Sequence, residues 1–219
     1  MAKTRVGVLI SGRGSNLQAL IEAAAVEDYP AEIALVVSNR PNAPGLKHAD
    51  AAGIARKVVN HRRYEDRARF DAAIDASLRE AKVDYVCLAG FMRILTDDFV
   101  RDWRGRILNI HPSLLPAFKG LHVQERMIEA GVKIAGCTVH FVSAEMDAGP
   151  VIGQAAVKVL PGDDADALAA RILKAEHKLY PACLKAVVEG TARLSGGLVM
   201  SDAPVRAGAP MFNPPIGRA

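Results

Sequence analysis

Residues 6–16 read VGVLISGRGSN, and this stretch decides the fold class of the chain. The apolar run at 6–10 predicts a short buried strand. Glycines at positions 12 and 14 allow a tight turn, and the amphipathic segment 17–25 that follows predicts a helix. A strand that turns directly into a helix starts a β-α-β unit, so we expect a mostly parallel sheet.

The same alternation of short apolar runs and amphipathic segments continues to about residue 111. Further buried strands are predicted at 33–37, 85–89 and 107–110, with a weaker edge strand at 57–59. Helices are predicted between them at 43–52, 64–81 and 96–103. This order favours parallel strands joined by right-handed crossovers.

The pattern changes after residue 120. Residues 123–130 predict a helix, and residues 137–142 and 151–157 predict two strands joined by a polar loop, which suits an antiparallel pair at the sheet edge. A long helix is predicted from Asp163, with aspartates capping its start and Pro181 causing a kink or break inside it.

These segments together predict the α/β class. We expect one Rossmann-like domain over residues 1–195, with a mostly parallel twisted sheet, antiparallel edge strands and helices on both faces. Residues 196–219 contain four glycines and four prolines, which predicts a loosely ordered C-terminal tail.

Length and composition are those of an ordinary globular domain: 219 residues, 50% hydrophobic and 24% charged. No apolar stretch approaches the roughly 18 residues of a membrane span, and no signal peptide begins the chain, so we expect a cytoplasmic protein. The net charge of +4 suits a small anionic substrate or a mildly basic surface. Cys87, Cys137 and Cys183 lie far apart in apolar runs, which is typical of reduced core thiols.

The strongest functional signal is the stretch 109–116, NIHPSLLP, directly after an apolar run. Side chains alternate along a strand, so Asn109 and His111 point the same way. Pro112 ends the strand behind them, and ligands of open α/β sheets bind at the carboxyl ends of strands. We therefore predict that both side chains enter one cleft.

Two further segments follow predicted strands. Gly14, Ser15 and Asn16 open the first helix, where free amides can hold a phosphate; the spacing suits a monophosphate better than a dinucleotide, and a turn without ligand is the alternative. Residues 91–95, FMRIL, predict either a pocket for a flat heterocycle or a hydrophobic plug beneath a loop.

Asp147 lies in a predicted loop. It is either a turn former or a partner that orients a neighbouring imidazole.

Two other interpretations are weaker. His111, His140 and Asp147 could surround a metal, but no helical histidine pair with ligand spacing accompanies them. The basic run 61–69 could contact nucleic acid, but its interleaved acidic residues favour a solvated helix start.

Five motifs in order make the chain resemble the phosphoribosylglycinamide formyltransferases, the folate-dependent formyl-transfer enzymes of purine synthesis. They are residues 10–17, 88–94, 108–116, 139–142 with 147–150, and 176–177 with 180–181. The match extends from Val6 to about Gly190. Lys119 departs from it, because some relatives carry proline there, and this leaves the flexibility of the loop open.

The resemblance implies transfer of a formyl group from 10-formyltetrahydrofolate to the amine of 5'-phosphoribosylglycinamide, without a metal. It implies the catalytic trio Asn109, His111 and Asp147. The ribonucleotide contacts implied are Gly14, Ser15 and Asn16 for the phosphate, and Glu176. The folate contacts implied are Arg67, Met92, Arg93, Ile94, Leu95 and Asn109.

The chemistry of formyl transfer agrees with this trio. Negative charge builds on the formyl oxygen while a proton moves from the attacking amine to the departing folate nitrogen. The Asn109 amide and a protonated His111 can donate to that oxygen, and Asp147 can keep the imidazole charged. The expected partners are two small molecules, with no nucleic acid and no membrane; a homodimer is compatible with the resemblance.

Three alternatives stay open at this point. Methionyl-tRNA formyltransferase carries a further C-terminal domain and formyltetrahydrofolate hydrolase a further N-terminal one, and we expect neither in 219 residues. A nucleotide-binding module without catalysis would leave the converging amide, imidazole and carboxylate without a use.

Overall fold

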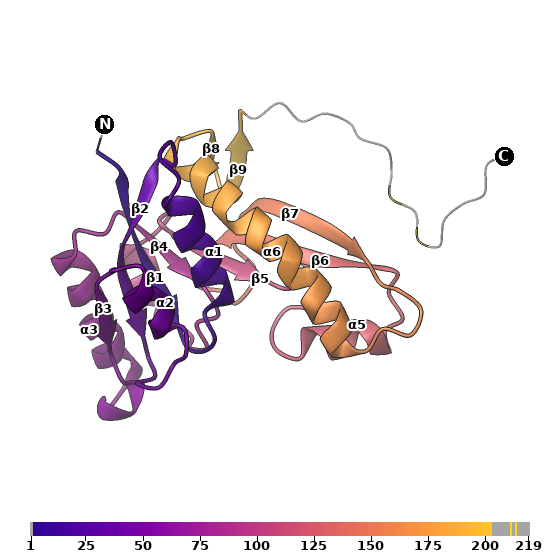
Figure 1. The fold of residues 1–219 in the computed structure, drawn as a ribbon, viewed down its shortest axis with the longest axis horizontal. Helices are drawn as coiled ribbons and strands as arrows, with labels where there is room; N and C mark the ends of the chain where they lie inside the picture. Colours follow the sequence, from indigo (N-terminus) through magenta and orange to yellow (C-terminus); the bar gives the residue numbers. More distant parts are fainter. Residues whose placement is uncertain (1, 203–210, 212, 214–219) are drawn as a thin grey trace.

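A seven-stranded sheet in the order β3-β2-β1-β4-β5-β6-β7 forms the centre of the computed structural model, which describes residues 2–202, 211 and 213 (Figure 1). The strands are β1 (Thr4–Ile10), β2 (Ala31–Ser38), β3 (Arg56–Val58), β4 (Tyr85–Leu88), β5 (Ile107–His111), β6 (Ile134–Phe141) and β7 (Val151–Lys158). Strands β1 to β5 are parallel, whereas β6 runs antiparallel to β5 and β7 antiparallel to β6. The predicted fold class, including the antiparallel edge, is confirmed.

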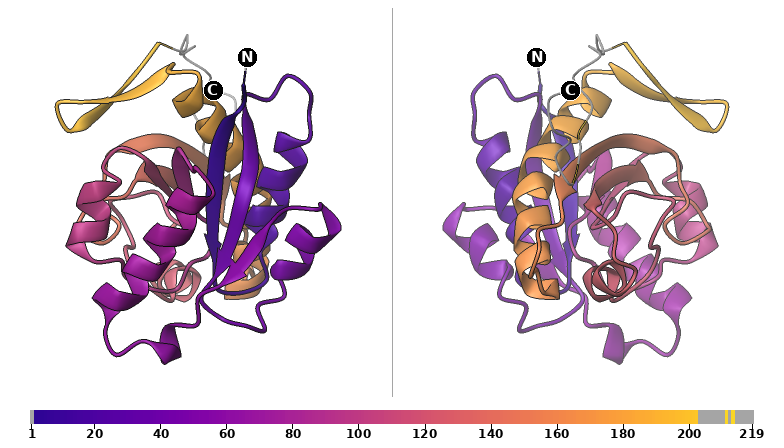
Figure 2. Two further views of the ribbon diagram at one scale, coloured as in Figure 1. Left: turned by 90° about the vertical axis from the view of Figure 1, so that its left-hand side faces the viewer. Right: turned by 90° about the vertical axis from the view of Figure 1, so that its right-hand side faces the viewer.

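Helices cover both faces of the sheet, as the two turned views show (Figure 2). They are α1 (Ser15–Ala24), α2 (Leu46–Ala51), α3 (Arg67–Glu80), α4 (Asp97–Asp102), α5 (Val123–Glu129) and α6 (Ala165–Val188). Alternating residues of β1 supply two separate cores. Val8 packs with residues of α1, α2 and α6, whereas Leu9 packs with residues of α3 and α4.

Helix starts follow their capping residues. Asp66 accepts a hydrogen bond from the Arg69 amide at 2.8 Å, so α3 begins at Arg67, three residues later than predicted. His61–Arg63 forms a short 3-10 turn instead. Asp164 caps α6 in the predicted way, accepting from the Ala167 amide at 2.8 Å.

Helix α6 continues past Pro181, so the predicted break is absent. The Tyr180 hydroxyl is buried and bonds the carbonyl oxygens of Leu88, at 3.1 Å, and Leu108, at 2.9 Å. The helix therefore carries a side chain that is tied to two strands at the position before the proline. These contacts and the surrounding core packing offset the loss of one helical hydrogen bond.

The described chain ends in a second, two-stranded sheet. β8 (Ala192–Ser195) and β9 (Leu198–Ser201) pair antiparallel, and Gly196 and Gly197 between them both have positive φ, 58° and 86°. Two consecutive glycines of this kind make the tight turn that suits a hairpin. Residues 196–201 are thus regular rather than loosely ordered, and most of the predicted tail lies outside the described residues.

Two further sequence predictions concern the state of the cysteines and the absence of a membrane span. The three cysteines are free and buried, and burial raises the pKa of each thiol to about 12. In the part of the chain that the structure describes, no helix has the length and apolarity needed to cross a membrane.

The sheet order reverses direction between β1 and β4, because β2 and β3 lie on one side of β1 and β5 lies beyond β4. The loops that leave these two neighbouring strands are bonded together. The Ser11 amide donates to the Gly90 carbonyl at 3.1 Å, and the Met92 amide donates to the Ser11 hydroxyl at 2.8 Å. Such a reversal is where open α/β sheets bind ligands.

Candidate active site

Asn109 and His111 lie at the carboxyl end of β5, next to the strand reversal. In the antiparallel ladder Asn109 is opposite His140 of β6, and His111 is opposite Thr138. The strand alternation therefore brings the amide and the imidazole to the same edge, as the sequence predicted.

The His111 ring is held between two oxygen atoms. Its Nδ1 lies 3.5 Å from Asp147 Oδ2, and its Nε2 donates to the Phe118 carbonyl at 3.0 Å. The side chains of His111 and Asp147 are only 7% and 12% exposed. A carbonyl only accepts, so Nε2 carries the proton of this hydrogen bond, while Nδ1 faces the carboxylate.

Asp147 lies in the loop between β6 and β7 and connects this loop to the one that contains Lys119 and Gly120. Its backbone has a φ of 51°, a left-handed conformation that aspartate tolerates better than most residues. The Oδ2 atom that faces His111 also accepts from the Gly120 amide at 2.9 Å. Lys119 adds a second connection, an ion pair with Glu145 at 2.8 Å. Lys119 therefore forms an exposed ion pair between the two loops.

Asn109 and His140 form a direct hydrogen bond, with 3.1 Å between Asn109 Nδ2 and His140 Nε2. The other ring nitrogen of His140 donates to the Phe141 carbonyl at 2.9 Å. Burial lowers the pKa of His140, which favours the neutral ring. With both ring nitrogens bonded inside the protein, His140 is not arranged as a metal ligand, and the described residues contain no group of three metal-binding side chains.

The predicted phosphate loop is a compact turn at the start of α1. Gly14 has a φ of +76°, and a Cβ atom there would lie 2.7 Å from the Gly45 Cα. The Gly45 amide donates to the Gly12 carbonyl at 3.0 Å. The first amides of a helix have no acceptor within it, so those of α1 are available to an anion.

Asn16 and Glu176 meet beside this loop, although 160 residues separate them. Asn16 Nδ2 donates to Glu176 Oε2 at 2.7 Å, and both side chains are buried. Burial raises the pKa of Glu176, while the bond from Asn16 and the charge of His111 act against this. Asn16 Oδ1 is buried without a hydrogen-bond partner in the structure, so the pair offers an unused acceptor.

The sequence pattern of the family described as formyl transferase matches residues 4–184 of this chain. The chain belongs to that family. A phosphoribosylglycinamide formyltransferase of Haemophilus influenzae is 42% identical over 198 residues, which cover 90% of this chain and 93% of the relative. The structure of glycinamide ribonucleotide transformylase 1 from Symbiobacterium toebii is 46% identical, with a TM-score of 0.89 and coverage of 91% of this chain and 94% of that one. The resemblance seen in the sequence is confirmed.

A longer relative also matches this formyl transferase. The trifunctional purine biosynthetic protein adenosine-3 of Bos taurus is 53% identical over 192 residues, which cover 88% of this chain. These residues are 19% of the relative, so the chain spans about a fifth of that protein's length.

The predicted folate segment of this formyl transferase has two faces. Phe91 and Leu95 are buried in the core beside α3 and α4, whereas Met92, Arg93 and Ile94 are exposed, Met92 and Ile94 at 60% each. Phe91 and Leu95 therefore act as a hydrophobic plug, whereas Met92, Arg93 and Ile94 form an open surface.

Asp71 was missed by the sequence reading, although it supports this segment. It is buried in α3, and its Oδ2 accepts from the Thr96 amide at 2.6 Å. Burial raises its pKa, and the guanidinium groups of Arg67 and Arg93 act against this. The two arginines named as folate contacts thus lie around one carboxylate. The sequence signal for this role of Asp71 was an aspartate among the apolar positions of a predicted helix.

Thr138 was missed as well. Its hydroxyl donates to the Ser113 carbonyl at 2.6 Å and accepts from the Leu115 amide at 3.0 Å. Gln154 donates to the Leu115 carbonyl at 2.9 Å. This network holds the turn that follows His111, and its signal in the sequence was a polar residue, Thr138, inside an apolar strand.

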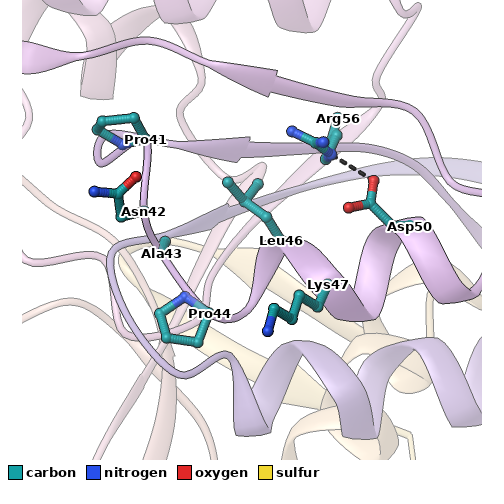
Figure 3. Close-up of a pocket in the computed structure, with 8 residues that line it drawn as sticks. All are labelled: Pro41, Asn42, Ala43, Pro44, Leu46, Lys47, Asp50 and Arg56. Carbon is teal, nitrogen blue, oxygen red and sulfur yellow. Dashed lines mark hydrogen bonds and ion pairs between the residues drawn. The ribbon is translucent and has the colours of Figure 1, made fainter.

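A hollow of about 370 Å³ lies beside α2. Figure 3 shows the residues that line it, between Pro41 and Arg56. An ion pair between Asp50 and Arg56, 2.5 Å long, borders it. None of the predicted site residues lines this hollow, although two of its lining residues, Pro44 and Leu46, flank Gly45 beside the phosphate loop.

Proposed function

We propose that this formyl transferase moves the formyl group of 10-formyltetrahydrofolate to the amine of 5'-phosphoribosylglycinamide and releases tetrahydrofolate. The observation that carries the proposal is the His111–Asp147 pair, with 3.5 Å between Nδ1 and Oδ2, two residues along β5 from the Asn109–His140 pair. The glycine turn and the Asn16–Glu176 pair support it, since they suit a phosphorylated, amine-bearing substrate.

The reaction forms one carbon–nitrogen bond and breaks another. The amine nitrogen attacks the formyl carbon, the bond from that carbon to the folate nitrogen breaks, and a proton passes from the amine to the departing nitrogen. Negative charge develops on the formyl oxygen, and hydrogen-bond donors fixed in place beforehand stabilise it most effectively. The folate supplies the activated formyl group, and the protein supplies the donors and a route for the proton.

His111 Nε2–H is the donor that can serve this oxygen, because Nδ1 faces Asp147. In the free enzyme the Phe118 carbonyl accepts this proton at 3.0 Å. Exchanging a neutral carbonyl for a developing oxyanion strengthens the bond, since charged acceptors bind roughly twice as strongly. Asp147 faces the other ring nitrogen, so it can orient the ring and take part in moving the amine proton.

One assay separates the proposal from its alternatives. The protein is mixed with 5'-phosphoribosylglycinamide and 10-formyltetrahydrofolate, and release of tetrahydrofolate is followed. Release that requires the ribonucleotide supports the proposal. Loss of the formyl group without the ribonucleotide would identify a hydrolase, formylation of methionyl-tRNA would identify the tRNA enzyme, and binding without turnover would identify a nucleotide-binding module.

The partners and the location stay proposals of the same kind. We propose a cytoplasmic enzyme whose partners are small molecules, and a homodimer remains a prediction to be measured by light scattering of the purified protein.

Gly14→Val is expected to weaken ribonucleotide binding at least about tenfold, since a branched side chain would occupy the place where the phosphate meets the helix amides. The new Cβ would also press on Gly45 Cα, 2.7 Å away, at a φ of +76°. Calorimetry with each ligand measures the effect, and folate affinity should fall much less. Gly12→Ala is the matched control, because a Cβ there meets nothing within 4 Å. Equal losses for both ligands in Gly14→Val would show that the loop is only structural.

Met92→Asp is expected to reduce folate affinity at least about tenfold, because the carboxylate would be buried unpaired once the folate covers it. Met92 is 60% exposed in the free protein, so stability should change little. Fluorescence titration with folate, beside thermal melting, tests both statements. Unchanged affinity would place the folate elsewhere.

Glu176→Gln is expected to bind the ribonucleotide about tenfold more weakly, since a charged hydrogen bond is lost. The same variant should be more stable than the parent at neutral pH. Burial raises the pKa of Glu176 above its usual 4.5, so the folded protein binds this proton more readily than the unfolded chain. The carboxylate therefore costs stability above the raised pKa, and this cost disappears as the pH falls below the unfolded value.

Denaturant unfolding of Glu176→Gln and the parent across pH 4 to 8 measures this difference. We expect the difference in unfolding free energy between Glu176→Gln and the parent to be largest at neutral pH and to close toward pH 4. A variant that is less stable than the parent at neutral pH would contradict the assigned cost of the buried carboxylate.

A further inference from the structure

His140 contributes no atom to the trio, yet it is 2% exposed and directly opposite Asn109 in the β5–β6 ladder. Its two nitrogens are both engaged, Nε2 with Asn109 Nδ2 at 3.1 Å and Nδ1 with the Phe141 carbonyl at 2.9 Å. The mechanism has so far given this buried imidazole no role.

The Phe141 carbonyl determines which ring nitrogen carries the proton. A carbonyl only accepts, so His140 Nδ1 must be the N–H donor, and in the neutral ring Nε2 is then a lone pair. The charged and titratable groups that act on His140 are Asp147 and His111, with opposite effects, and burial outweighs both. His140 therefore presents an acceptor to Asn109.

The Phe141 carbonyl is itself held firmly in place. A Cβ on Gly149 would lie 1.7 Å from this oxygen and 3.3 Å from His140 Nδ1, so only glycine allows this approach. The Phe141 amide donates to the Pro150 carbonyl at 2.9 Å. The turn beyond Asp147 therefore positions the Phe141 carbonyl, and this carbonyl in turn determines the tautomer of His140.

An acceptor at His140 Nε2 selects one of the two orientations of the Asn109 carboxamide. Rotation by 180° would bring Asn109 Oδ1 against the lone pair of His140, two acceptors facing each other. In the observed orientation one N–H of the amide is bonded to His140, and the second N–H remains as a donor of known position. An unrestrained carboxamide would populate both orientations.

We propose that His140 is a positioning residue for formyl transfer, which acts by holding the Asn109 carboxamide in its donating orientation through an Nδ1–H tautomer. The proposal rests on the proposed function and deepens it: His140 touches neither substrate and works only through Asn109.

The test is a double-mutant cycle on the full-length enzyme. His140→Leu should lower kcat by about tenfold to a hundredfold, part of the cost of removing an oxyanion donor, with both KM values within about threefold of the parent. His140→Gln should recover most of the lost turnover, because its amide oxygen can accept from Asn109 Nδ2. In the Asn109→Ala background, His140→Leu should cost less than about twofold, since the group it orients is gone.

Two outcomes of the cycle would overturn the proposal. One is a parental kcat in His140→Leu. The other is an equal loss in the Asn109→Ala background, which would mean that His140 acts independently of Asn109. If the unsubstituted enzyme itself transfers no formyl group, the proposed function fails instead, and the two failures are therefore distinguishable.

A spectroscopic test needs no substitution and holds even where a variant fails to fold. In protein labelled with ¹⁵N-histidine, the long-range proton–nitrogen spectrum should show His140 as the neutral Nδ1–H tautomer at neutral pH. A neutral Nε2–H tautomer or a charged ring would remove the acceptor that Asn109 requires and overturn the proposal.

Discussion

Replacing His111 by alanine is expected to lower turnover by at least about a hundredfold, because the lost N–H is the proposed donor to the developing oxyanion. The ring contacts the Phe118 carbonyl and Asp147 in the free enzyme, so its substitution removes no contact to the phosphate loop. Ribonucleotide affinity should therefore stay close to that of the parent. Steady-state kinetics beside calorimetry measure the two effects separately.

Two controls sharpen this prediction. Thermal melting establishes that His111→Ala is folded, which matters because the ring is buried. Asp147→Asn keeps the shape of the carboxylate while removing its charge, so it should lower turnover in the same direction with an intact imidazole. Near-normal turnover of folded His111→Ala would overturn the mechanism.

Asn109→Ala is expected to cause a loss of similar size, at least about a hundredfold in kcat, for the same electrostatic reason. The double variant with His111→Ala should lose less than the product of the two single losses, since both donors act on one oxygen as a unit. Pre-steady-state mixing isolates the chemical step from product release. Strict multiplication of the two losses would show that the residues act at separate steps.

The trio and the positioning of Asn109 give the site an order of dependence. In the proposed mechanism, Asn109 and His111 donate to the same reacting atom, Asp147 orients His111 and His140 orients Asn109. Both supporting residues lie at the antiparallel edge, in β6 and the loop after it. The glycine turn that is proposed to hold the phosphate follows β1, in the parallel part of the sheet.

Much of the fold could be predicted because its signals are local. The run 6–10 followed by two glycines predicts a strand and a turn, and the structure has β1 and α1 in those places. At Pro181 a longer-range contact decided the outcome: α6 does not break there, because Tyr180 is bonded to two strands. The hairpin turn at 196–197 is local, since its two glycines both take positive φ, and here the sequence signal was assigned to a loosely ordered tail.

The sequence by itself determined the α/β class, the place of Asn109 and His111 on one strand face, and the glycine turn before α1. These depend on periods of two and 3.6 residues and on backbone freedom, which act between near neighbours in the chain. Only the tertiary structure decided the pairs Asn16–Glu176, His111–Asp147 and Asn109–His140, whose members are 160, 36 and 31 residues apart. Strand order and register bring such residues together, and both depend on the packing of the whole sheet, which no local pattern specifies.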